Sequence, residues 1–144
     1  MEACPFHCIY CDQVKISGHA KMPGFDEVKE IINKHLTTIP ADHSLVEVGF
    51  FGGTFTGLKK EIQENYLKVV FPFIQRGKIS SVRISTRPDF IDQIVIDLLK
   101  KYSVKTIELG AQSMDDDVLQ QTARGHTAED VAHAARLIKM NQLR

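Results

Sequence analysis

The chain has 144 residues, which is enough for one domain. Hydrophobic residues make up 43% of it and charged residues 25%, an ordinary globular balance that excludes a disordered or fibrous protein. Its 18 basic and 18 acidic side chains cancel, so the net charge does not indicate a nucleic-acid-binding surface, although a local basic patch is compatible with it. The sequence contains no apolar run of membrane-spanning length and no secretion signal at its start, so we expect a cytoplasmic protein without membrane contacts.

Three cysteines lie close together near the start of the chain, at Cys4, Cys8 and Cys11, and the rest of the sequence contains none. Their odd number and short spacing make them a poor disulfide framework, because no pair would close a long loop. Clustered thiols in a reducing compartment are typical of metal binding. We expect residues 1–23, which include all three, to form a loop.

Two kinds of metal centre are compatible with this loop. A structural zinc ion needs four ligands, and His7 could be the fourth, although its position between two cysteines of a short loop strains the geometry. A cubane iron–sulfur cluster can instead take three cysteines and keep one iron open for an exogenous ligand. His126 and His133 are distant in sequence, and we expect them at the surface or on a helix face.

The remaining sequence alternates between helical and extended patterns. We predict strands over residues 45–51, 81–85 and 106–109. Helices are predicted over residues 26–36 and 59–75, after a cap at Asp89, and from starts at Ser113 and Thr127. Pro72 is expected to kink the second helix or begin its last turn, and Gly77 to end it.

Strands that alternate with helices indicate βαβ crossovers and a parallel sheet. Right-handed crossovers bring the carboxyl ends of all strands to one edge, which is where α/β proteins bind ligands. Small and polar segments follow each predicted strand at this edge, namely Gly52–Gly57, Ser85–Asp89 and Gly110–Ser113. Each segment alone could be only a turn or a cap, but their convergence favours a binding site.

Four motifs in order resemble one known family. The Cys4-x3-Cys8-x2-Cys11 spacing, with Tyr10 before the last cysteine, resembles the signature of the radical S-adenosylmethionine (radical SAM) superfamily. The segment Phe50–Thr54 resembles the glycine motif of that superfamily. Three further segments resemble the branch that contains the Elongator catalytic subunit and oxygen-independent coproporphyrinogen oxidase: Ser85–Asp89, Glu108–Ser113 and Thr122–Thr127.

The resemblance implies the fold. The superfamily core is a TIM-type (β/α) barrel with a parallel sheet, so we expect an α/β chain that forms part of such a barrel. The first strand and the C-terminal units of the barrel are expected to be missing. The chain is therefore expected to be a single partial core domain over residues 1–144, with a cluster loop over 1–23 and βα units over 24–144, from a longer enzyme.

The resemblance also implies the chemistry. In a radical SAM enzyme, Cys4, Cys8 and Cys11 would hold a 4Fe–4S cluster whose open iron chelates S-adenosylmethionine. Reductive cleavage would give methionine and a 5′-deoxyadenosyl radical, which abstracts hydrogen from a substrate that we leave unidentified. An external electron donor of the flavodoxin or ferredoxin type is the expected partner. The residues alone leave an alternative open, a zinc-stabilised α/β binding module without radical chemistry.

Cofactor-binding positions follow by motif, and no catalytic residue is predicted beyond the cluster ligands. The backbone of Gly52, Gly53 and Thr54 should meet the amino group of the cofactor. Gln112 and Arg124 match further cofactor-contacting positions, and the guanidinium of Arg124 suits a carboxylate. The backbone near Tyr10 should lie against adenine, or Tyr10 serves only in packing. Ser85 stands where the branch carries an acidic group for the ribose.

Overall fold

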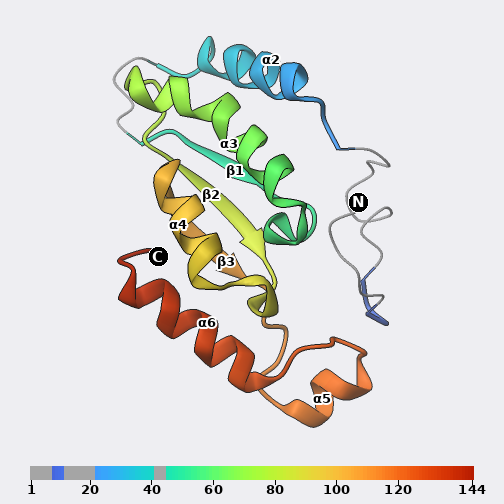
Figure 1. Ribbon diagram of the computed structural model, residues 1–144. Helices are drawn as coiled ribbons and strands as arrows, with labels where there is room; N and C mark the ends of the chain where they lie inside the picture. The colour runs from blue at the N-terminus through green and yellow to red at the C-terminus, as the bar shows by residue number, and fades with distance from the viewer. Residues whose placement is uncertain (1–7, 12–21, 41–44) are drawn as a thin grey trace.

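The computed structural model describes residues 8–11, 22–40 and 45–144, so Cys4 and His7 lie outside the described residues. Three parallel strands form one sheet, as predicted, and their order in it is β1-β2-β3 (Figure 1). The described helices and strands are α2 (Phe25–Leu36), β1 (Glu47–Phe50), η1 (Phe55–Gly57), α3 (Lys60–Gln75), β2 (Ser81–Thr86), η2 (Pro88–Phe90), α4 (Gln93–Lys101), β3 (Val104–Leu109), α5 (Asp116–Gln121) and α6 (Ala128–Met140). None of the described helices is long and apolar enough to cross a membrane.

The two faces of the sheet differ in polarity. The strand register places Glu47, Arg83 and Glu108 on one face, where the guanidinium of Arg83 donates to both carboxylates, at 3.0 and 2.9 Å. Val82 and Ile84 alternate with these residues and are fully buried on the other face. This period of two is that of half-buried strands, so one face of the sheet is left polar and the other is apolar.

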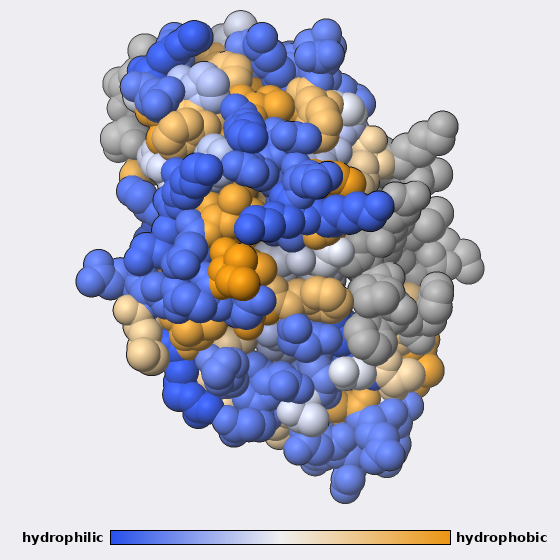
Figure 2. Space-filling model, viewed as in Figure 1, coloured by the Kyte–Doolittle hydropathy of each residue, from blue (hydrophilic) through white to orange (hydrophobic). Residues whose placement is uncertain are grey.

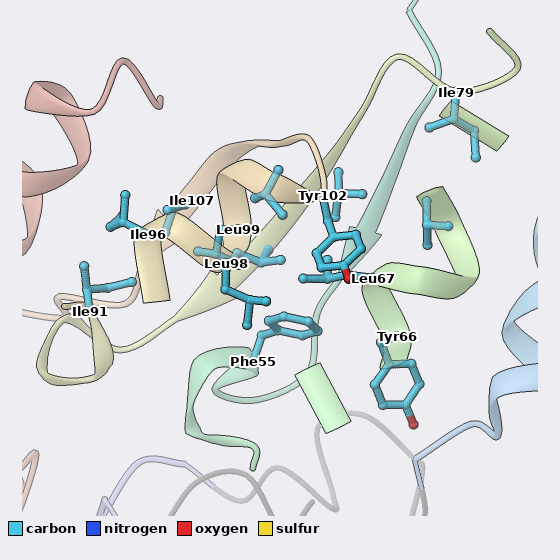
Figure 3. Close-up of a cluster of buried hydrophobic side chains, with 14 of the residues drawn as sticks. Phe55, Tyr66, Leu67, Ile79, Ile91, Ile96, Leu98, Leu99, Tyr102 and Ile107 are labelled. Atoms are coloured by element: carbon cyan, nitrogen blue, oxygen red, sulfur yellow. The ribbon is translucent and has the colours of Figure 1, made fainter. Parts of the chain in front are cut away.

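The helices bury the apolar face in a common core. Figure 3 shows Phe55, Leu67 and Leu99 directed into the space between η1, α3, α4 and the sheet. Leu67, Ile96 and Leu99 have no exposed surface. Full burial of one such side chain contributes about 1.5–3 kcal/mol to stability. The outer surface seen in Figure 2 is largely hydrophilic, with small hydrophobic patches between the polar side chains.

Several helix ends agree with the sequence. Thr127 and Asp130 form the predicted capping box of α6, in which each side chain accepts a hydrogen bond from the backbone N–H of the other, at 3.2 and 2.7 Å. Gly77 has a φ of 67° just beyond α3, which is the left-handed conformation typical of a helix stop. Pro72 opens the last turn of α3, since its carbonyl accepts from Arg76 N–H at 3.2 Å.

Two predicted caps are wrong. The N-cap of α4 is Asp92, whose carboxylate accepts from Val95 N–H at 2.7 Å, because the carboxylate of Asp89 is held by Arg87 instead. The N-cap of α5 is Asp115 rather than Ser113. The hydroxyl of Ser113 accepts from Asp115 N–H at 3.0 Å and so shapes the turn that precedes the helix.

The backbone after α6 returns to the sheet. The N–H of Arg144 donates to the carbonyl of Lys105 at 2.9 Å, and the N–H of Ile107 donates to the carbonyl of Arg144 at 2.6 Å. When the N–H and the carbonyl of one residue bond to the two residues that flank its partner on the neighbouring strand, the two segments run parallel. Parallel pairing therefore continues past β3 at this residue, as expected for part of a larger parallel sheet.

Candidate functional site

The segments after the three strands meet at one edge of the sheet, as the topology predicts. The hydroxyls of Thr56, which follows β1, and Thr86, at the end of β2, lie 2.5 Å apart. The N–H of Gly110, which follows β3, donates to the carbonyl of Thr86 at 2.8 Å. These contacts fix the three strand ends relative to one another, which is what a binding site at this edge requires.

The glycine motif forms the turn that leaves β1. Gly52 has a φ of 93°, a conformation that glycine adopts without strain. Thr54 is buried, and its carbonyl accepts from Gly57 N–H at 3.0 Å to begin η1. The hydroxyl of Ser85 donates to the carbonyl of Gly53 at 3.4 Å. Four of the predicted cofactor-contacting residues are therefore brought together at the ends of β1 and β2.

An apolar groove opens beside this turn, between α2 and β1. Its volume is about 220 Å³, and Gly53 and Thr54 are among the residues that line it. The remaining lining is mainly hydrophobic and includes Ile32, Phe50 and Tyr66. The groove thus adds apolar surface next to the glycine motif.

Arg124 links the end of β3 to the cysteine loop. Only 6% of its surface is exposed. Its Nη1 donates to the Sγ of Cys8 at 3.7 Å, and its Nη2 donates to the carbonyl of Gly110. The flanking residues Ala123 and Gly125 have φ values of 53° and 80°, so the backbone bends sharply on both sides of this arginine.

The described part of the cysteine loop is a single turn. The N–H of Cys11 donates to the carbonyl of Cys8 at 3.0 Å, and the N–H of Ile9 donates to the carbonyl of Thr122 at 3.3 Å. The turn is thereby attached to the segment after α5, and Figure 1 shows it on the side toward which the strands point. Cys8 is buried, and neither it nor Cys11 is in a disulfide.

This environment fits thiolate ligation. The Nη1 of Arg124 donates to the Cys8 sulfur, and cysteine sulfurs are the ligands that hold iron–sulfur clusters. The Nε of Arg124 is buried without a hydrogen-bond partner among the described atoms, so the local charge is left available to a group at this edge. The described residues 8–11, 22–40 and 45–144 contain no group of three metal-binding side chains, since the predicted set includes Cys4.

Tyr10 and Gln112 lie near the contact between Arg124 and Cys8. Tyr10 is 45% exposed; burial of the remainder raises the pKa of its hydroxyl, and the Arg124 guanidinium opposes that rise. Gln112 is exposed and has a φ of 69°. Its Nε2 lies 3.7 Å from the point where a Cβ on Gly110 would stand, and the Nη2 of Arg124 lies 3.0 Å from the same point. Gln112 therefore turns back toward Arg124.

The surface position predicted for His126 is wrong. Its exposure is 5%, because it lies directly before α6, which packs against η2, whereas His133 is exposed as expected. Its Nε2 lies 3.1 Å from the carbonyl of Ala111, to which it donates, and its Nδ1 lies 3.8 Å from an oxygen of Asp89. Burial lowers the pKa of His126, and the neighbouring arginines add to that effect.

An ion pair behind this edge was not predicted from the sequence. Arg87 is 1% exposed, and its Nε and Nη2 donate to the two carboxylate oxygens of Asp89 at 2.9 and 2.8 Å. The spacing of an arginine and an aspartate around Pro88 is the only local sign of this pair. The hydroxyl pair of Thr56 and Thr86 leaves no such sign, since its members are 30 residues apart.

Known proteins resemble this chain over most of its length. Elongator complex protein 3 of Saccharomyces cerevisiae is 32% identical over 108 residues, covering 62% of this chain and 19% of that protein. The coproporphyrinogen-III oxidase-like protein HemZ of Bacillus subtilis is 26% identical, covering 97% and 30%. The tRNA uridine(34) acetyltransferase of Dehalococcoides mccartyi is 24% identical, covering 94% and 36%. The chain thus spans about a fifth to a third of the length of these relatives.

A solved structure shares the fold. It is that of archaeal Elp3 from Methanocaldococcus infernus with an N-terminal deletion, which matches with a TM-score of 0.58 at 23% identity over 76% of this chain and 30% of that one. The likeness agrees with a partial TIM-type arrangement. The sequence profile of the Radical SAM superfamily matches residues 1–144, the whole chain. By this match, and with the order of its motifs along the sheet edge, the chain belongs to the radical SAM superfamily.

Proposed function

We propose that this chain is the partial core of a radical SAM enzyme. In this proposal Cys4, Cys8 and Cys11 hold a 4Fe–4S cluster, which supplies the electron for cleavage of S-adenosylmethionine to methionine and a 5′-deoxyadenosyl radical. The observation that carries the proposal is the position of the Cys8 sulfur. It lies against Arg124, which is itself bonded to the end of β3, so the cysteine turn faces the edge at which the strand ends meet.

The chain's own groups at this edge suit the parts of the cofactor. The turn at Gly52–Thr54 includes the carbonyl of Gly53, which already accepts from the Ser85 hydroxyl. Backbone groups of this turn suit the amino group of the cofactor. Gln112 and Arg124 stand at the end of β3 and suit a carboxylate. The groove beside Thr54 adds an apolar surface on that side. An external one-electron donor of the flavodoxin or ferredoxin type is the proposed partner.

Anaerobic reconstitution with iron and sulfide tests the proposal. About four irons and four sulfides should bind per chain. Addition of S-adenosylmethionine and dithionite should then give methionine and 5′-deoxyadenosine in equal amounts. Cys8→Ala should lose both the cluster and the cleavage, whereas His133→Ala, which changes an exposed helix residue, should keep both.

The zinc module makes the opposite prediction in the same experiment. Metal analysis of the purified protein would find one zinc and no sulfide, and His7→Ala would release that zinc. For the cluster, His7→Ala should change the iron content little. A wild-type protein that takes up zinc but no iron would therefore contradict the proposed function.

A further inference from the structure

We propose that His126 is a positioning residue for cofactor binding: it holds the carbonyl of Ala111 and so fixes the turn from which Gln112 reaches the cofactor. This role deepens the proposed function and rests on it, because it presupposes that the end of β3 binds S-adenosylmethionine. His126 itself lies behind this turn and acts through the backbone, not by touching the cofactor or the cluster.

The turn after β3 is held in a conformation that its residues do not prefer. Gln112 has a φ of 69°, in the left-handed region that residues other than glycine rarely adopt. Such a conformation persists only where surrounding contacts hold it, and it is common where a ligand is gripped. The N–H of Gly110 donates to the carbonyl of Thr86 at 2.8 Å, which fixes the start of the turn. The peptide group between Ala111 and Gln112 needs a further anchor.

His126 supplies this anchor. Its Nε2 lies 3.1 Å from the carbonyl oxygen of Ala111, which belongs to the peptide group that leads into Gln112. Because a carbonyl only accepts hydrogen bonds, Nε2 carries the hydrogen and donates it. The imidazole has no exposed surface, so water cannot take the place of this donor. The bond therefore fixes the carbonyl directly before Gln112.

The imidazole is itself held from two sides. Its Nδ1 lies 3.8 Å from an oxygen of Asp89, and both oxygens of that carboxylate accept from Arg87. On the other side, the next residue, Thr127, is the N-cap of α6 and forms a capping box with Asp130. Helix α6 packs against η2, the element that contains Asp89. His126 thus connects the segment after β2 to the turn after β3.

Equilibrium binding of S-adenosylmethionine to the reconstituted, unreduced protein tests this role without turnover. His126→Phe keeps an aromatic ring but removes the donor, so the dissociation constant should rise about tenfold at an unchanged iron content. His126→Gln can still donate to the carbonyl of Ala111 and should bind nearly as wild type does. Ile79→Ala is the control for lost stability, because this buried residue precedes β2 at the opposite end of the sheet. It should bind the cofactor as wild type does.

Amide hydrogen exchange of the cofactor-free protein gives a second measurement. The N–H of Ala111, which donates to the carbonyl of Leu109 at 2.9 Å, should exchange faster in His126→Phe than in wild type, since the turn opens more often. In His126→Gln it should exchange at the wild-type rate. The N–H of Val82, which donates to the carbonyl of Ser103, lies at the other end of the sheet and should not change in either variant. His126→Leu replaces His126→Phe in both measurements if circular dichroism shows that the larger ring prevents folding.

The outcomes separate this role from the proposed function. A reconstituted wild-type protein that binds no S-adenosylmethionine contradicts the proposed function itself. Wild-type affinity in His126→Phe overturns the positioning role alone, and so does an equal loss of affinity in His126→Phe and His126→Gln, because the donor would then not be responsible. An equal loss in Ile79→Ala would trace the effect to general stability and would also overturn it.

Discussion

The hydroxyl oxygens of Thr56 and Thr86 lie 2.5 Å apart, and both side chains are buried, at 5% and 3% exposure. The pair joins the turn after β1 to the end of β2, directly behind the candidate site. Each hydroxyl has the other as a partner in a place that water does not reach. The two side chains should therefore depend on one another for their contribution to stability.

A double-mutant cycle measures this dependence. Thr56→Val and Thr86→Val each keep the shape of the side chain but leave the other hydroxyl buried without this partner, so each should cost about 1–3 kcal/mol in the free energy of unfolding. The double variant removes both hydroxyls and should cost clearly less than the sum. Urea denaturation of the four proteins checks this, and simple additivity of the two changes would show that the hydroxyls are not coupled.

Breaking the ion pair of Arg87 and Asp89 should lower the free energy of unfolding more than breaking an exposed ion pair. Asp89→Asn leaves the guanidinium of Arg87 buried beside a neutral partner, and loss of one member of a buried pair costs about 3–5 kcal/mol. Because the Asp89 side chain is 20% exposed, we expect a value toward the lower end of that range. Urea denaturation of wild type and of Asp89→Asn measures this loss in the free energy of unfolding.

The matched control is the exposed pair of Arg136 and Glu129, whose side chains are 60% and 76% exposed. Glu129→Gln should change the free energy of unfolding by less than about 1 kcal/mol. Equal costs for Asp89→Asn and Glu129→Gln would mean that burial does not set the strength of these pairs.

The sequence predicted the parts of this fold that depend on local pattern. The three strands, the parallel sheet and the helices between them follow from hydrophobic period and from breakers such as Gly77. Strand β1 proved shorter than predicted, Glu47–Phe50 rather than residues 45–51. Helix caps were less predictable, because two acidic residues near one helix start, Asp89 and Asp92, compete for the role, and the sequence does not show that Arg87 holds the carboxylate of Asp89.

Of the candidate site, the sequence predicted which residues reach the sheet edge but not what they touch. The positions of Ser85 and Gly53 follow from topology, and their contact follows from the register of β1 and β2. The contact of Arg124 with Cys8 spans 116 residues and depends on how the segment after α5 folds back. The burial of His126 has the same cause. Such contacts are properties of tertiary packing, which a single sequence does not display.

Gly110 should tolerate no side chain without cost. In Gly110→Ala the new Cβ would stand 3.0 Å from the Nη2 of Arg124 and 3.5 Å from the carbonyl of Thr86, so the buried arginine would have to shift. Overpacking of this kind costs about 1–3 kcal/mol. Gly24→Ala is the control, because a Cβ there meets nothing within 4 Å. Thermal unfolding of both variants compares them, and equal melting temperatures would contradict the tight packing at Gly110.

His126 should make the protein sensitive to mild acid. Burial lowers the pKa of its imidazole in the folded state, while in the unfolded chain the pKa returns to about 6.5. As the pH falls below about 6.5, the unfolded state takes up a proton that the folded state does not, so the free energy of unfolding should decrease until the pH passes the folded pKa. Above that range the contribution of His126 is fully present.

His126→Gln can still donate to the carbonyl of Ala111 but does not titrate, so urea denaturation between pH 7 and pH 5 should show a smaller loss of stability than in wild type. His133→Gln removes an exposed histidine of α6 and should keep the full wild-type loss. If His126→Gln loses as much stability as wild type over this range, the buried imidazole is not the group responsible.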